Sequence, residues 1–297
     1  MTTSAKVDIT SIAKNTALPL MEHGETIKVY NYLSTQSPDI AMGVNIGGAG
    51  DQGMMFGYAC RDTEQMMPLP WAMATDALKS LDELRISNPN LGFLPDAKSQ
   101  VTYDRDNNTI TTFLISTQHE TDMDMEKIKR WSHHIMYEVC DKYGLKPPQR
   151  KLVNPTGRFV IGGPYADAGL TGRKIIADTY GGYCAHGGGA FSGKDPTKVD
   201  RSGAYMARKI AKDILRDAPA HIHECVVQLA YAIGVAEPVS IYISLDGKSH
   251  PELAEKVMKT YDLTPKGIID KFDLKHFDYN RVSAYGHFGK EDLPWEA

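Results

Sequence analysis

Cysteine is scarce in this chain of 297 residues, and no two cysteines form a Cys-x-x-Cys pair. The four cysteines are Cys60, Cys140, Cys184 and Cys225. Without paired cysteines, neither a zinc knuckle nor a redox dithiol is indicated. A sparse scatter of thiols is typical of proteins from a reducing compartment, so we expect a cytoplasmic location.

The sequence also has no long apolar run and no excess of basic charge. The longest apolar stretch, residues 226–245, is interrupted by Gln228, Glu237 and Pro238, so it predicts buried strands rather than a membrane span. Residues 1–6 contain no apolar core of a secretory signal. A formal net charge of −4 argues against a nucleic-acid partner, because such binding requires a basic surface. We therefore expect neither a membrane nor a nucleic acid as a partner.

The spacing of apolar residues predicts a mixture of helices and strands. The clearest helix begins near Thr121 and ends at Gly144, because Ile128, Trp131 and Ile135 recur at helical spacing. Further helices are expected over 9–18, 72–84, 202–219 (with Ser202 as N-cap) and 251–261, and strands over 1–8, 101–103, 109–116, 226–233 and 239–245. The turn-forming run at 104–108 predicts that the strands over 101–103 and 109–116 form a hairpin. These elements do not alternate as in a doubly wound sheet, so the predicted fold class is α+β.

Glycine is concentrated between Asn154 and Arg201, among charged side chains. Glycine at this density costs backbone entropy, so some feature of the structure should require it. One such feature is the close approach of main-chain N–H groups to an anion. The cations of the segment are Arg158, Arg173, Lys174, Lys194, Lys198 and Arg201, and its carboxylates are Asp167, Asp178, Asp195 and Asp200. Carboxylates beside phosphates usually imply Mg²⁺. The pattern predicts a polyphosphate site, although turns with solvated charges would have the same composition.

One part of this segment comes close to the P-loop pattern. Residues 188–194 fit G-x-x-x-x-G-K, but Asp195 stands where a P-loop has its Mg²⁺-binding Ser or Thr. His186 and Gly187 precede the motif, where a P-loop requires a strand. A Walker-type ATPase is therefore not indicated, whereas a polyphosphate site of another design is.

Two longer motifs resemble the hallmarks of S-adenosylmethionine synthetases. One covers residues 48–58, Gly-Ala-Gly-Asp-Gln-Gly-Met-Met-Phe-Gly-Tyr, and the other covers residues 187–195, Gly-Gly-Gly-Ala-Phe-Ser-Gly-Lys-Asp. Shorter blocks that also fit lie at 36–40, 96–100, 116–119, 154–164, 169–174 and 284–289. The blocks occur in the family order over essentially the whole chain, so the resemblance is specific.

The resemblance implies a reaction, a fold and an assembly. The family joins the sulfur of L-methionine to C5′ of ATP, and the released triphosphate is then cleaved to pyrophosphate and phosphate. Its fold has three similar α+β domains built from non-consecutive segments, which here would be 62–162, 1–39 with 163–201, and 40–61 with 202–297. Its sites lie between two subunits, so a homodimer or a dimer of dimers is implied. The implied ligands are ATP, L-methionine, S-adenosylmethionine, Mg²⁺ and K⁺.

The resemblance also implies roles for individual residues. A thioether is already nucleophilic, so such an enzyme must align the reactants and stabilise a leaving group that gains negative charge. The expected catalytic residues, which would grip the triphosphate, are Lys98, Arg173 and Lys194. The other implied ATP-binding residues are Asp96, Arg158, Phe159 and Lys174, and Asp200 would hold Mg²⁺. The implied methionine-binding residues are Gln36, Asp51, Asp167, Lys198 and Ile233.

The chain departs from the family pattern at its start. Members carry a segment before the point that matches Met1, with a Gly-His-Pro-Asp-Lys motif and two glutamates that bind K⁺ and methionine. We therefore expect the domain that contains the N-terminus to be truncated. One hypothesis is a working synthetase, alone or completed by a separate N-terminal polypeptide. The alternatives are a non-catalytic or regulatory subunit that pairs with a full-length synthetase, and an enzyme that only hydrolyses tripolyphosphate.

Overall fold

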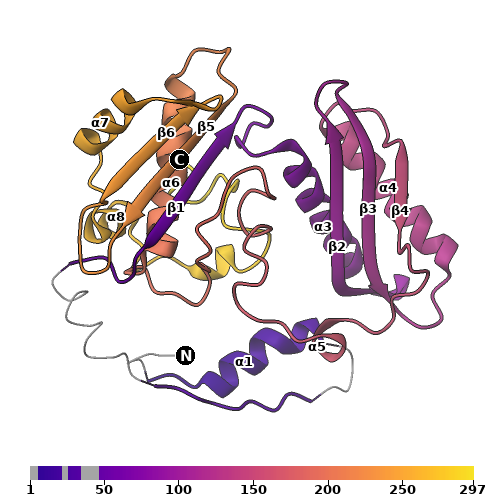
Figure 1. The fold of residues 1–297 in the computed structure, drawn as a ribbon. Helices are drawn as coiled ribbons and strands as arrows, with labels where there is room; N and C mark the ends of the chain where they lie inside the picture. Colours follow the sequence, from indigo (N-terminus) through magenta and orange to yellow (C-terminus); the bar gives the residue numbers. More distant parts are fainter. Residues whose placement is uncertain (1–5, 22–25, 35–46) are drawn as a thin grey trace. The chain divides into compact units, whose positions relative to one another are not determined.

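A computed structural model describes residues 6–21, 26–34 and 47–297 and shows a mixture of helices and sheets (Figure 1). The predicted α+β class is confirmed. The chain divides into two compact units. Of the described residues, unit 1 contains 6–21, 26–34 and 70–169, and unit 2 contains 47–69 and 170–297. Two sheets are found among these residues, one in each unit.

Unit 1 is built on a three-stranded sheet in the order β2-β3-β4. Strands β2 (Phe93–Asp104) and β3 (Thr109–His119) form the predicted antiparallel hairpin, and β4 (Arg150–Val153) runs parallel to β3. Helices α3 (Leu69–Ser87) and α4 (Met125–Lys142) lie against this sheet (Figure 1). The smaller elements of the unit are α1 (Ile9–Ala17), η1 (Leu18–Leu20), η2 (Pro89–Leu91) and α5 (Gly163–Ala166).

Helix α4 shows how local chemistry sets an element and its packing. The side chain of Asp124 caps its N-terminus by accepting a hydrogen bond from the Glu126 N–H, so the helix begins later than Thr121. Ile128, Ile135 and other residues at helical spacing are buried, as the apolar pattern predicts. The exposed side of the helix is charged.

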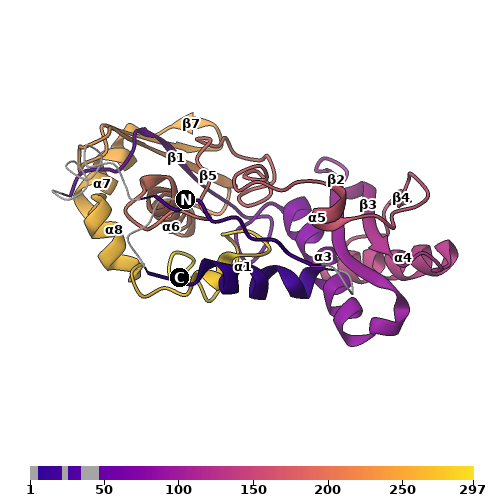
Figure 2. The same ribbon diagram turned by 90° about the horizontal axis from the view of Figure 1, so that it is seen from below.

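Unit 2 is built on a four-stranded antiparallel sheet in the order β1-β5-β6-β7. Helix α6 (Val199–Asp217) packs along one face of the sheet, across β1 and β5 (Figures 1 and 2). The strands are β1 (Gly53–Cys60), β5 (Glu224–Tyr231), β6 (Ser240–Leu245) and β7 (Lys248–Ser249). The remaining helices are α7 (Pro251–Thr260), α8 (Pro265–Phe272) and η3 (Tyr279–Val282).

Strand β1 joins a segment from early in the chain to the C-terminal sheet. The sequence did not predict this strand, because Gly53 and Gly57 weaken the strand pattern. Gly57 is required by the packing, since a Cβ there would lie 2.0 Å from the carbonyl oxygen of Ala207 in α6. The glycine therefore lets the helix backbone approach the strand closely.

Several local expectations are corrected by the structure. Helix α6 begins at Val199 with Lys198 as its N-cap residue, and Ser202 lies inside the first turn, where its Oγ donates to the Lys198 carbonyl. Residues 6–8 of the strand expected over 1–8 are not in a strand, and residues 1–5 lie outside the described residues. Helix α8, which Thr264 caps through the Gly267 N–H, was not predicted.

The boundaries of the three predicted domains stay a prediction. Among the described residues, the segment expected to form the second domain, 1–39 with 163–201, contributes no strand to either sheet. No helix in the described part of the chain is both long and apolar enough to cross a membrane.

A buried ion pair connects the parts of unit 2. The Arg208 guanidinium in α6 and the Glu296 carboxylate are both almost fully buried, with 2.8 Å between Nη2 and Oε2. Arg208 also donates to the carbonyl oxygens of Tyr58, Gln65 and Met66. Burial alone would raise the pKa of Glu296, but the attraction of Arg208 and of a nearby lysine outweighs it and lowers that pKa. The carboxylate therefore stays ionised and holds the C-terminus against α6.

We predict that Arg208→Met lowers the free energy of unfolding by about 3–5 kcal/mol, because it leaves the Glu296 charge buried without its main partner. Chemical denaturation measures this difference. Lys266→Met is the matched control, because Lys266 forms an exposed ion pair with Asp270 and its loss should change stability little. Equal effects of the two substitutions would contradict the assigned importance of the buried pair.

Candidate polyphosphate site

The two hallmark motifs meet at the backbone of unit 2. Residues 187–195, here called the glycine loop, pass so close to β1 that a Cβ on Gly187 would lie 1.7 Å from the Met54 carbonyl oxygen. A Cβ on Gly189 would lie 2.2 Å from the carboxyl carbon of Asp200. Such distances admit only glycine, so the loop gains its position from the absence of side chains.

The glycine loop brings a cation and a carboxylate together. The Lys194 ammonium donates to the Asp200 carboxylate, and both side chains are partly buried. Asp200 lies in the first turn of α6, where the partial positive charge of the helix N-terminus stabilises a carboxylate. An anion and a cation are thus held side by side next to the glycine loop.

Two further predicted cations lie on a turn that packs against the glycine loop. Gly172 has φ +84°, and a Cβ there would lie 2.8 Å from the Cβ of Ala190. Arg173 and Lys174 follow directly and are exposed. The structure therefore places the backbone of the turn with Arg173 beside the loop with Lys194, and both basic side chains have access to solvent.

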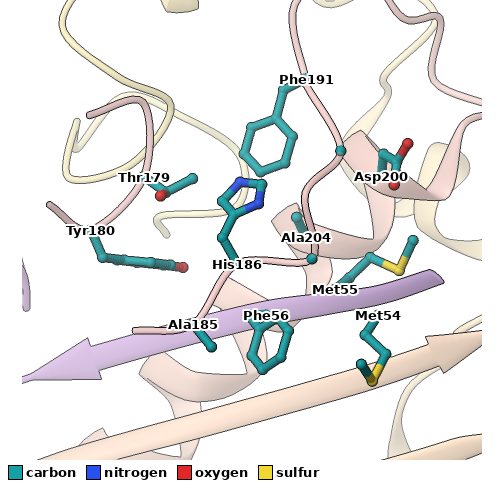
Figure 3. Close-up of a pocket in the computed structure, with 12 residues that line it drawn as sticks. Met54, Met55, Phe56, Thr179, Tyr180, Ala185, His186, Phe191, Asp200 and Ala204 are labelled. Atoms are coloured by element: carbon teal, nitrogen blue, oxygen red, sulfur yellow. The ribbon is translucent and has the colours of Figure 1, made fainter. Parts of the chain in front are cut away.

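An aromatic cluster supports the glycine loop from below. Phe191 is buried and makes edge contacts with Tyr205 and His287, with ring centroids 5.7 and 5.1 Å apart. Beneath the loop lies a cavity of about 10 Å³, close to what a single water molecule needs (Figure 3). Among its lining residues, Asp200 comes from α6 and His186 from the start of the loop (Figure 3).

His287 connects the block at 284–289 to the glycine loop. Its Nδ1 lies 2.7 Å from the Tyr205 hydroxyl, and its Nε2 lies 3.3 Å from the Ser192 Oγ. Its main-chain carbonyl accepts from the Trp295 indole at 2.9 Å. Burial lowers the pKa of His287 to about 3, and the charges of Arg201 and Lys290 act in the same direction. The ring is therefore neutral at physiological pH.

The predicted nucleotide residues of unit 1 lie around its β2–β3 hairpin. Asp96 on β2 accepts a hydrogen bond from the Gly163 N–H at 2.9 Å, at the start of α5. Phe159 is fixed by its backbone, because its N–H donates to Nε2 of His119 and its carbonyl accepts from the His119 N–H. Lys98 on β2 is exposed. Arg158, just before Phe159, is also exposed.

The predicted methionine-binding residues are divided between the two units. In unit 2, the loops that carry Asp51 and Ile233 are joined by two backbone hydrogen bonds, from the Ala49 N–H and from the Gly234 N–H. Asp51 and Ile233 are both exposed. Lys198 is the N-cap residue of α6, and in unit 1 Asp167 follows α5 and is exposed. Gln36 lies outside the described residues.

The structure thus brings together one part of the expected site in each unit. Lys194, Asp200 and the turn with Arg173 lie together in unit 2, whereas Lys98, Asp96 and Phe159 belong to unit 1. The chain before the glycine loop is not a strand, which agrees with the rejection of a P-loop. Sequence reasoning gave no role to His186 or His287, although His186 directly precedes three consecutive glycines.

Comparison with protein families gives two matches, whose boundaries differ from those of the two units because β1 of unit 2 lies in the first match. Residues 46–159 match the model for the central domain of S-adenosylmethionine synthetase, and residues 161–297 match the model for its C-terminal domain. Together the matches span the chain from residue 46 to its end, except Val160. The chain belongs to the S-adenosylmethionine synthetase family.

The low pKa of His287 predicts a loss of stability in acid. The unfolded histidine, with a pKa near 6.5, binds a proton that the folded state does not bind until about pH 3. Stability should therefore fall as the pH decreases from 6.5, by about 2 kcal/mol at pH 4.5. We expect His287→Asn to reduce this slope in denaturation measured at each pH. His221→Asn, which changes an exposed histidine, should leave the slope as in the parent protein.

Proposed function

We propose that this protein forms S-adenosylmethionine from ATP and L-methionine and cleaves the released tripolyphosphate to pyrophosphate and phosphate. The observation that carries this proposal is the close approach of the two hallmark motifs at Gly187 and Met54, together with the pairing of Lys194 in the glycine loop with Asp200 of α6. Membership of the S-adenosylmethionine synthetase family supports the same reaction class. A cytoplasmic location, proposed from the scarce cysteines, is compatible with this chemistry.

The proposed displacement needs charge stabilisation more than proton transfer. A bond forms between the methionine sulfur and C5′ of ATP as the bond between C5′ and the triphosphate oxygen breaks. The sulfur supplies its own lone pair, so no general base is required. Lys194, with Arg173 and Lys174 on the adjacent turn, would bind the departing triphosphate and stabilise its developing charge. Main-chain N–H groups of the glycine loop would add donors to the same oxygens.

The residues present fit Mg²⁺ as an ion held by one protein carboxylate. Among the described residues, no group of three His, Cys, Asp or Glu side chains could enclose a metal ion. Mg²⁺ is usually bound through one or two carboxylates together with substrate phosphates and water, and Asp200 beside the glycine loop fits that role. Bound Mg²⁺ would neutralise phosphate charge. A role for K⁺ rests on the family resemblance alone.

The other ligand contacts in the proposal follow the family pattern. Lys98, Asp96, Arg158 and Phe159 of unit 1 would contact ATP. Asp51, Asp167, Lys198 and Ile233 would contact methionine, together with Gln36. Substitution of each residue tests its assigned contact.

The proposed assembly is a homodimer or a dimer of dimers. The face of the unit 2 sheet opposite α6 carries Met54 and Tyr242, which are 49% and 41% exposed. Gln228 lies between them, because its Cα pairs with that of Tyr242 and its amide contacts the Met54 sulfur. A second copy would cover this apolar surface, and a separate N-terminal polypeptide could complete the site.

We predict that Lys194→Ala lowers kcat for S-adenosylmethionine formation by about 10²–10³-fold, because it removes a cation from the leaving group. Product formation from ATP, L-methionine and Mg²⁺ measures the effect. Lys266→Ala is the control, since it removes an exposed lysine of α8. If the parent protein, confirmed as folded, makes no product, or if both variants match it, the proposed reaction is wrong.

The same assay separates the two alternative functions. Phosphate release from tripolyphosphate without methionine, in the absence of S-adenosylmethionine formation, would indicate a tripolyphosphatase. Activity that arises only when the chain is mixed with a full-length synthetase, together with a mixed complex in native mass spectrometry, would indicate a regulatory subunit.

A further inference from the structure

His186 contacts the glycine loop through one nitrogen of its ring. Its Nδ1 accepts a hydrogen bond from the Gly188 N–H at 2.8 Å. An acceptor at Nδ1 requires the hydrogen of the neutral ring to be on Nε2. Gly188 has φ +92°, so this contact holds a residue in the left-handed region, which favours glycine.

His186 also contacts the middle of the same loop through its ring. Its ring stacks on Phe191, with centroids 5.7 Å apart and planes 28° apart (Figure 3). Phe191 is itself fixed by edge contacts with Tyr205 and His287. His186 therefore joins the aromatic cluster to a backbone amide near the start of the loop.

The surroundings leave the loop little freedom to adjust if this link is lost. Gly187 lies against the Met54 carbonyl, and Gly189 lies against the Asp200 carboxylate. A movement of the Gly188 peptide must therefore move a residue that touches β1 or Asp200. Because Lys194 is paired with Asp200, the cation would be displaced as well.

The electrostatic setting favours a neutral ring at this position. Burial lowers the pKa of His186, Asp200 opposes that shift and Lys194 adds to it. A neutral ring can accept from Gly188 without adding charge beside Lys194. The histidine is thus suited to shape the loop rather than to bind phosphate as a cation.

We propose that His186 is a positioning residue that sets the glycine loop for polyphosphate binding through its Nδ1 acceptor, while stacking on Phe191 orients the histidine ring. This inference rests on the proposed function, because the proposed function supplies polyphosphate as the ligand of the glycine loop. The inference predicts that tripolyphosphate binding requires a hydrogen-bond acceptor at the δ position of residue 186. A ring of similar shape that lacks this acceptor should not replace the histidine.

Two substitutions separate the acceptor from the ring. His186→Phe keeps an aromatic ring for stacking but leaves the Gly188 amide without its acceptor, whereas His186→Asn carries an amide oxygen near the position of Nδ1. Binding of tripolyphosphate with Mg²⁺, measured by titration calorimetry at pH 7.5, should weaken by about tenfold or more in His186→Phe. His186→Asn should stay within about threefold of the parent protein.

Thermal unfolding of both variants shows whether the loss is confined to the site. If His186→Phe fails to fold, His186→Gln replaces it in the comparison, because its amide reaches the position of Nε2 instead of Nδ1. Weaker binding by Gln than by Asn then supports the inference. The inference is overturned if His186→Phe binds tripolyphosphate as tightly as the parent protein. It is also overturned if His186→Asn loses as much binding as His186→Phe, or as His186→Gln where that variant replaces it.

The parent protein and Lys194→Ala distinguish failure of this inference from failure of the proposed function. Tripolyphosphate binding by the parent that is lost in Lys194→Ala supports the polyphosphate site, whatever the His186 variants do. If the parent does not bind tripolyphosphate, both the proposed site and the role of His186 are wrong.

Discussion

The buried contact between Arg208 and Glu296 is the interaction on which unit 2 depends most. The guanidinium reaches β1, the loop that follows it and the C-terminal end of the chain from a single position on α6. An ion pair so deeply buried is tolerated because each partner has several hydrogen bonds. Since α6 also carries Asp200 and β1 supports the glycine loop, the geometry of the candidate site follows from the same arrangement of helix and strand.

Close backbone approach is the second constraint on the site. Gly57 brings α6 onto β1, Gly187 brings the loop onto the same strand, and Gly189 admits the Asp200 carboxylate. These three glycines of the hallmark motifs thus have packing reasons that are separate from ligand binding. The resulting loop presents its amides beside Lys194, so one arrangement of the backbone serves both packing and the proposed chemistry.

Much of the fold could be predicted where periodicity is strong and local. The α4 helix, the β2–β3 hairpin and α7 follow from apolar spacing, turn residues and Pro251. Strand β1 could not be found in this way, because its glycines are explained only by a helix distant in the sequence. The start of α6 was misplaced because Ser202, which resembles a cap, is instead buried in the first turn.

The sequence by itself determined the family resemblance, the mixed α+β class and the set of charged residues around the glycine loop, because these depend on residue identity and spacing. Only the tertiary structure decided that Lys194 pairs with Asp200, that the Arg173 turn packs on the loop, and that His186 holds the Gly188 amide. These contacts depend on the approach of backbones and rings from separate segments. The physical reason is that hydrogen bonds and close packing act over a few ångströms in space, whatever the separation along the chain.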